Sequence, residues 1–198
     1  AHSGADINGD IFMLPPYYSL PPISPPDYTA SQGSISGKNI TLHSSDSGKY
    51  SKISISNNGT LSINGDLILY ITGDIELKNN AEIEVKNNAT LTLYFDGDIE
   101  AKNSSGFNNK TEIPANLLIY GTGDSQEIKL KNSADLYAVI YAPHADMTVH
   151  NSVDAYGSFI VSDMELKNSG TIYYDKALKQ VSEDDELARF MVTRWEEL

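Results

Sequence analysis

Acidic side chains at glycine-containing turns are the first candidates for chemistry in this chain. Gly-Asp pairs recur at residues 65–66, 73–74, 97–98 and 123–124. Because Ca²⁺ prefers carboxylate oxygens, Asp74, Asp96 and Asp98 are candidate calcium ligands. An aspartate that caps a turn through its own side chain is the commoner explanation of the same pattern. The sequence therefore predicts no required cofactor, with calcium as the one candidate.

The same carboxylates could serve a carbohydrate-active enzyme. Glycoside hydrolases need two carboxyl groups about 5–9.5 Å apart, and a polysaccharide lyase needs a basic side chain beside calcium-bound carboxylates. Asp96 and Asp98 would lie on one strand face with Asp74 stacked near them, but no arginine or buried lysine joins the group. We therefore predict a protein that is not an enzyme, and keep a polysaccharide lyase or hydrolase as the alternative.

Two histidines flank an aspartate in the pattern His144-x-Asp146-x-x-x-His150. These positions fall on one face of an extended strand. A strand rises about 3.3 Å per residue, so His144 and His150 would lie about 20 Å apart, too far to share a metal ion. The pattern indicates surface residues at turns.

The composition excludes several classes of protein. The chain has no cysteine, so disulfides, thiol nucleophiles and cysteine-bound metals are excluded. Its net charge is −13, which opposes binding to nucleic acid. No apolar run approaches the roughly 18–20 residues that a membrane-spanning helix needs, so this segment is not expected to insert into a membrane.

The middle of the chain alternates apolar and polar residues in short runs. These runs predict strands at residues 53–56, 61–63, 67–70, 75–78, 83–86 and 91–94. Between them stand Asn-Asn, Asn-Gly, Asn-Ser and Gly-Asp pairs, which are typical of turns. Helical spacing is not sustained anywhere in this region.

An asparagine recurs after the alternating runs. The intervals between the six positions are 8, 16, 29, 19 and 17 residues, and the longest is attributed to a loop insertion at 106–114. Spacings of 16 to 19 fit one turn of a stacked coil, with 8 as half a turn. Asparagines at equivalent corners can bond to one another in a ladder. The ladder is predicted from Asn79, Asn87, Asn103, Asn132, Asn151 and Asn168.

The predicted fold is all-β: a single-stranded right-handed β-helix, or β-solenoid. Residues 1–32 are a proline-rich extended segment that packs on the domain or leads into it. Residues 33–178 form the β-helix. Residues 179–198 supply a short capping helix and a closing strand, because an open terminal turn would be a template for edge-to-edge pairing.

The last turns carry a family resemblance. It is carried by residues 136–149 (LYAVIYAPHADMTV), 154–161 (DAYGSFIV), 166–170 (LKNSG), 172–175 (IYYD) and the terminal WEEL. The region resembles the C-terminal β-helical domain of PilX-like type IV pilus assembly proteins and related bacterial surface proteins. His144 and His150 stand where those proteins more often have Asn, Ser or Gly. The resemblance implies an exported domain at the cell surface, on a pilus or outside the cell, with no catalytic residues to transfer.

The function expected is therefore a non-enzymatic structural or adhesive domain. Its partners would be pilus or envelope proteins or surface glycans. Tyrosine offers contact area and a hydroxyl group at low entropy cost, so candidate contact residues are Tyr137, Tyr141, Tyr156, Tyr173 and Tyr174. A self-assembling solenoid scaffold is the second alternative.

Overall fold

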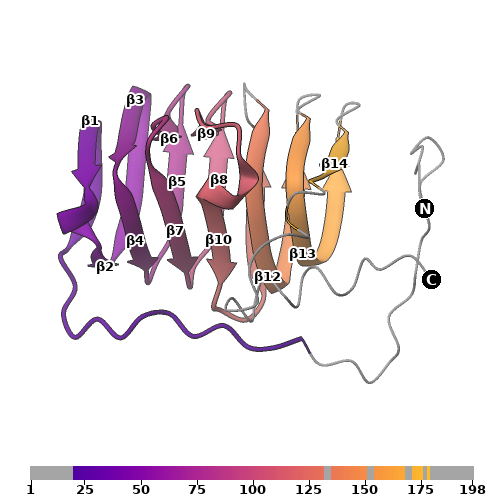
Figure 1. The fold of residues 1–198 in the computed structure, drawn as a ribbon, viewed down its shortest axis with the longest axis horizontal. Helices are drawn as coiled ribbons and strands as arrows, with labels where there is room; N and C mark the ends of the chain where they lie inside the picture. Colours follow the sequence, from indigo (N-terminus) through magenta and orange to yellow (C-terminus); the bar gives the residue numbers. More distant parts are fainter. Residues whose placement is uncertain (1–19, 132–134, 151–153, 168–170, 176–177, 179–198) are drawn as a thin grey trace.

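Parallel strands stacked in a coil make up the computed structural model, which describes residues 20–131, 135–150, 154–167, 171–175 and 178. The coil is a β-solenoid of about six turns, running from β1 to β14 along the horizontal axis of Figure 1. The predicted β-solenoid is confirmed, whereas the predicted cap at 179–198 lies outside the described residues. The strands are β1 (Ser34–His43), β2 (Gly48–Tyr50), β3 (Lys52–Asn64), β4 (Asp66–Ile71), β5 (Ile75–Lys78), β6 (Glu82–Val85), β7 (Thr90–Phe95), β8 (Ile99–Lys102), β9 (Gly106–Asn109), β10 (Leu117–Gly121), β11 (Gln126–Leu130), β12 (Leu136–Val149), β13 (Ala155–Leu166) and β14 (Ile172–Tyr174), with 3₁₀ turns η1 (Ser44–Asp46) and η2 (Pro114–Asn116).

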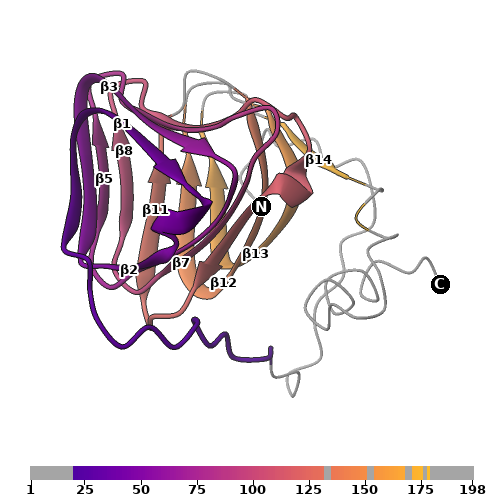
Figure 2. The ribbon, with the colours of Figure 1, turned by 60° about the vertical axis from the view of Figure 1, so that its left-hand side comes forward.

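Three walls of stacked strands surround the core, and Figure 2 shows them from a view turned by 60°. Wall A contains β2, β4, β7, β10, the first halves of β12 and β13, and β14. Wall B contains the first halves of β1 and β3, then β5, β8, β11 and the second halves of β12 and β13. Wall C contains the second halves of β1 and β3, then β6 and β9.

Alternation of apolar and polar residues builds each wall. In β7, Leu91, Leu93 and Phe95 are buried, and the residues between them are half-buried on the outer side. Neighbouring turns repeat this pattern in register, so a continuous apolar column fills the coil. The six predicted runs fall on strands, and only Lys86 lies just past the end of β6.

The strand register gives the length of each turn. Residues in equivalent positions are 22 and 24 residues apart in the early turns, which pass all three walls. After a turn of 29 residues, the last turns shorten to 19 and 17 residues and lack wall C. The interval of 8 residues between Asn79 and Asn87 was predicted to be half a turn. It instead separates two different corners of one turn.

The extra residues of the long turn follow β9 rather than starting with it. The predicted insertion at 106–114 is therefore wrong at its start, because Gly106–Asn109 is a regular strand of wall C. The buried side chain of Asn109 donates hydrogen bonds of 2.9 Å to the carbonyl of Ile113 and 3.0 Å to the carbonyl of Tyr137. These bonds fix the loop against β12, where wall C ends.

The N-terminal segment runs along wall A, as the indigo trace in Figure 1 shows from residue 20 onward. Leu20 and Ile23 pack against a cluster that contains Tyr120 and Tyr141. The hydroxyl of Tyr141 donates a 2.7 Å hydrogen bond to the carbonyl of Pro21. Leu20, Pro21 and Ile23 thus cover the part of the outer side of wall A around Tyr120 and Tyr141. None of the described residues belongs to a helix long and apolar enough to cross a membrane.

Candidate interaction surface

Three tyrosines stack on one another at the C-terminal end of the described coil. Tyr137, Tyr156 and Tyr173 occupy equivalent positions in β12, β13 and β14. The ring centroids of Tyr137 and Tyr156 are 4.7 Å apart with planes 8° from parallel, and those of Tyr156 and Tyr173 are 4.7 Å apart at 10°. We call these three residues the tyrosine row. Because Tyr173 is 45% exposed and the other two are half-buried, the row is open to solvent.

The other two predicted contact tyrosines lie elsewhere. Tyr141 is fully buried beneath the N-terminal segment, so it is not a surface residue. Tyr174 follows Tyr173 directly, so its side chain points to the opposite side of β14, where it is half-buried. The five tyrosines therefore do not form one stripe. Single-sequence patterning does not reveal that the N-terminal segment covers Tyr141.

Carboxylates border the tyrosine row. Asp135 and Asp154 each lie two residues before a tyrosine of the row and therefore on the same outer side. Oδ1 of Asp135 accepts a hydrogen bond of 3.3 Å from the amide of Asp154 in the next turn. Burial raises the pKa of Tyr137, and the charges of Glu112, Asp135 and Asp154 raise it further. The surface around the row is therefore negatively charged.

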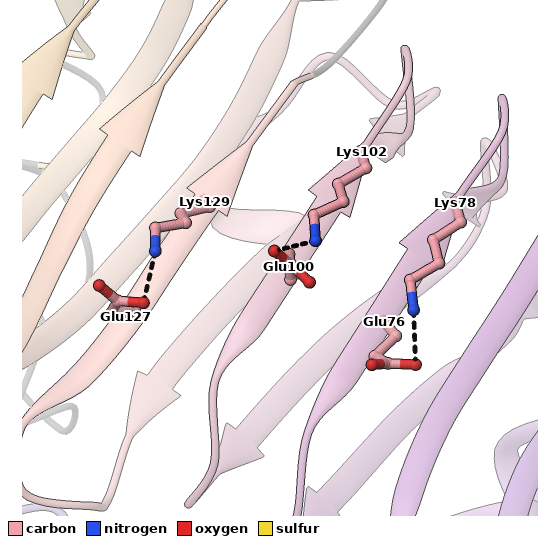
Figure 3. A network of polar contacts seen from close by, with 6 residues as sticks. All are labelled: Glu76, Lys78, Glu100, Lys102, Glu127 and Lys129. Carbon is pink, nitrogen blue, oxygen red and sulfur yellow. Dashed lines mark hydrogen bonds and ion pairs between the residues drawn. The ribbon is translucent and has the colours of Figure 1, made fainter.

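A regular set of ion pairs covers the outer side of wall B (Figure 3). Each pair joins a glutamate to the lysine two residues later: Glu76–Lys78 at 3.1 Å, Glu100–Lys102 at 2.5 Å and Glu127–Lys129 at 2.5 Å. Their side chains are between 32% and 52% exposed, and such exposed pairs contribute about 0–1 kcal/mol each. The pairs neutralise one another, so we do not place the binding site on wall B.

The three calcium candidates hold neighbouring turns together. Oδ1 of Asp74 accepts a 3.0 Å hydrogen bond from the amide of Asp98, and Oδ1 of Asp98 accepts one of 2.8 Å from the amide of Glu127. Asp96 accepts hydrogen bonds from the hydroxyls of Tyr70 and Thr122. Among the described residues, no three histidines or acidic residues gather in a group that could hold a metal ion. The bonding of these carboxylates therefore agrees with a structural role.

The asparagine row forms at the corner between walls B and C. Nδ2 of Asn79 donates a 3.2 Å hydrogen bond to Oδ1 of Asn57, and Oδ1 of Asn79 accepts one of 2.8 Å from Nδ2 of Asn103. All three have a positive φ of 55° or 56°, a conformation that asparagine tolerates better than most residues.

Of the six asparagines predicted to form the ladder, Asn79 and Asn103 belong to this row. Asn87 lies between β6 and β7, at the corner between walls C and A. Asn57 belongs to the row although the repeat did not single it out, because Asn57-Asn58 follows Ser56 rather than lysine or histidine. The remaining predicted members, Asn132, Asn151 and Asn168, lie outside the described residues.

His144 lies in the second half of β12, and His150 is the first residue after that strand. His144 is exposed, and His150 is half-buried between the turns that carry Lys131 and Lys167. Burial lowers the pKa of His150, and the positive charges of these two lysines lower it further. A neutral imidazole in a row of lysines reduces the repulsion along that corner.

The fold and this surface define a β-solenoid with an exposed aromatic row near one end. The chain matches, over residues 27–181, a family described as a domain of unknown function (DUF7305). The match covers more than half of the chain, so the protein belongs to this family. No curated protein matches the chain, and no solved structure does.

Proposed function

We propose that this protein is a non-enzymatic structural or adhesive domain that uses the tyrosine row to contact a partner at the cell surface. The observation that carries the proposal is the row itself: three aromatic side chains held at one spacing by strands that pair through their backbones. Such a surface loses little entropy on binding, because the backbone is already ordered and a tyrosine has few rotatable bonds.

A place in the cell envelope or on a type IV pilus is part of this proposal. It rests on the resemblance of residues 136–149, 154–161 and 172–175 to PilX-like pilus assembly proteins. These segments are successive turns of the coil, and each contributes one tyrosine to the row. In this proposal the coil is right-handed, a short C-terminal helix closes its last turn, and the domain is exported to the cell surface.

Two further observations favour contact through side chains over catalysis or end-to-end assembly. Asp74, Asp96 and Asp98 accept hydrogen bonds that join turns, so they are poorly placed to exchange protons with a substrate. At the other end of the coil, β1 has an irregular register between Gly37 and Asn39, with Lys38 at that point. A bulge and a lysine on an edge strand both discourage pairing with another chain.

The test compares the protein with the variant Tyr137→Ser/Tyr156→Ser/Tyr173→Ser for binding to surface appendages and envelopes of its source organism. We expect the triple variant to bind at least about tenfold less, because aromatic anchors dominate most interfaces. Ile68→Ser is the control, since Ile68 is also an exposed apolar residue but lies on wall A away from the row. Equal binding by the triple variant would contradict the proposal, as would release of sugars from a polysaccharide that Asp96→Asn abolishes.

A further inference from the structure

The stacking of the tyrosine row limits what it can offer to a partner. With ring centroids 4.7 Å apart and planes within 10° of parallel, the facing sides of Tyr137, Tyr156 and Tyr173 contact one another. A sugar that stacks on an aromatic ring needs a free ring face, which Tyr156 in the middle of the row does not have. Apart from the outer faces of the two end rings, what the row offers is the ring edges and the phenol oxygens.

The charges beside the row are all negative among the groups that act on it. Asp135 and Asp154 flank Tyr137 and Tyr156, and Glu112 comes from the loop after β9. Glu112 and Asp135 are exposed, and Asp154 is half-buried. Oδ1 of Asp135 accepts a hydrogen bond from the amide of Asp154, and Oδ1 of Asp154 accepts one from the amide of Thr171. Oδ2 of each aspartate makes no hydrogen bond to the described residues. The surface therefore presents acceptor oxygens and negative charge side by side.

The pKa values of Tyr137 and Tyr156 are raised in this setting, so these two hydroxyls stay protonated. Burial raises the pKa of Tyr156, and Asp154, Tyr137, Asp135 and Tyr173 raise it further. Burial and the three carboxylates act on Tyr137 in the same direction. A neutral phenol can accept a hydrogen bond from a cationic donor. Both the tyrosine row and the carboxylates beside it therefore favour a cationic group that donates hydrogen bonds.

We propose that the partner is a protein that lays an extended, arginine-bearing segment along the tyrosine row, an inference that rests on the proposed function above. Guanidinium groups carry five N–H donors and no acceptor, and they pair with carboxylates through two parallel bonds. An extended segment fits because the acceptors are arranged in a line across three turns. The net charge of −13 would also draw a basic partner toward the protein.

The test uses a fluorescent peptide of about ten residues that alternates glycine and arginine, and its glycine–glutamine counterpart, with binding followed by anisotropy. We expect the arginine peptide alone to bind, and its affinity to fall as salt is raised from about 50 to 300 mM. Glu112→Gln/Asp135→Asn/Asp154→Asn should bind it at least about tenfold more weakly. Tyr137→Phe/Tyr156→Phe/Tyr173→Phe keeps the stack and should weaken binding about fivefold.

A matched variant separates a site from general attraction. Asp124→Asn/Asp146→Asn/Asp163→Asn removes the same number of negative charges from positions outside the tyrosine row. We expect it to weaken binding by less than about threefold. Equal loss in the two charge variants, or equal binding of the glutamine peptide, would overturn the proposal.

Two other occupants are outcomes of the same experiment. Both arginines of this chain, Arg189 and Arg194, lie in its last ten residues. If Arg189→Gln/Arg194→Gln binds the added peptide at least about tenfold more tightly, the chain's own end fills the row and the proposed partner is wrong. If the arginine peptide does not bind but attachment to surface appendages still depends on the tyrosines, the partner is of another kind, such as a glycan, and the proposed function stands. If attachment does not depend on the tyrosines, the proposed function itself fails.

Discussion

The hydroxyl of Tyr70 donates a 2.6 Å hydrogen bond to Oδ2 of Asp96, which lies 26 residues further along the chain in the next turn. Oδ1 of the same carboxylate accepts a hydrogen bond from the hydroxyl of Thr122, in the turn after that. One carboxylate thus joins three turns at the corner between walls A and B. A side chain that the sequence offered as a metal ligand is therefore engaged on both of its oxygens.

The burial of Tyr70 and its hydrogen bond to Asp96 make stability depend on pH in the alkaline range. Burial, the hydrogen bond to Asp96 and the charge of Asp96 raise the pKa of Tyr70 to about 12, from about 10 in an unfolded chain. Between these values the unfolded chain loses the proton while the folded protein keeps it. The free energy of unfolding should therefore fall as pH rises from about 10 to 12, by up to about 1.4 kcal/mol per pH unit from this group. Urea unfolding of Tyr70→Phe across this range should show a shallower fall, and an unchanged slope would contradict the assignment.

The asparagine row can be tested at its central member. Asn79→Ala loses two side-chain hydrogen bonds and places alanine at a φ of 56°, so we expect the free energy of unfolding to fall by about 2 kcal/mol. Asn79→Gly keeps the backbone conformation available and should cost about 1 kcal/mol. Asn87→Ala, at an exposed position outside the row, should change stability by less than about 0.5 kcal/mol. Equal costs for Asn79→Ala and Asn87→Ala, measured by urea unfolding, would show that the row adds nothing.

Close contact between the last turns depends on a glycine. A Cβ on Gly157 would lie 1.8 Å from the carbonyl oxygen of Ala138, and Gly157 has a φ of 144°. We expect Gly157→Ala to destabilise the protein by more than about 3 kcal/mol and to separate β12 from β13. Gly33→Ala is the control, because Gly33 also has a positive φ of 90° but a Cβ there would meet no atom within 4 Å. It should cost about 1 kcal/mol, and hydrogen exchange of the β12 and β13 amides would locate the damage. A Gly157→Ala variant no less stable than Gly33→Ala would refute the steric argument.

The structural role of the aspartates predicts how the protein responds to calcium. Because Asp74, Asp96 and Asp98 bond to groups of neighbouring turns, we expect millimolar Ca²⁺ or a chelator to shift the thermal midpoint by less than about 1 °C. Differential scanning calorimetry measures this directly. A clear upward shift of the thermal midpoint with calcium that is lost in Asp98→Asn would show that these aspartates are calcium ligands.

The identity of the strands could be predicted from the sequence because each strand obeys a local rule. Leu91, Leu93 and Phe95 alternate with polar residues, and a period of two admits only a strand with one buried face. The coil followed from repetition, since turns that cannot bury their apolar face alone must stack. The number of walls did not follow, because Asn79 and Asn87 look alike in sequence but mark different corners.

The candidate surface was only partly visible in the sequence for a related reason. Tyr137 and Tyr141 stand in one run with the same alternation, and both point outward from β12. Tyr141 is nevertheless buried, because Leu20, Pro21 and Ile23 pack over it from a segment 120 residues away. Likewise, Glu112 joins Asp135 beside the row only because Asn109 fixes the loop against β12.

The sequence by itself therefore determined the class of fold, the strands and the acidic character of the protein, since these depend on composition and on neighbours a few residues apart. The tertiary structure decided which tyrosines stay open, which asparagines bond and what each aspartate contacts. These outcomes depend on which turn lies above which. The asparagine spacing of 29, 19 and 17 residues matched the later turns, but it split one early turn of 24 residues into 8 and 16, because asparagines at two different corners look alike in sequence.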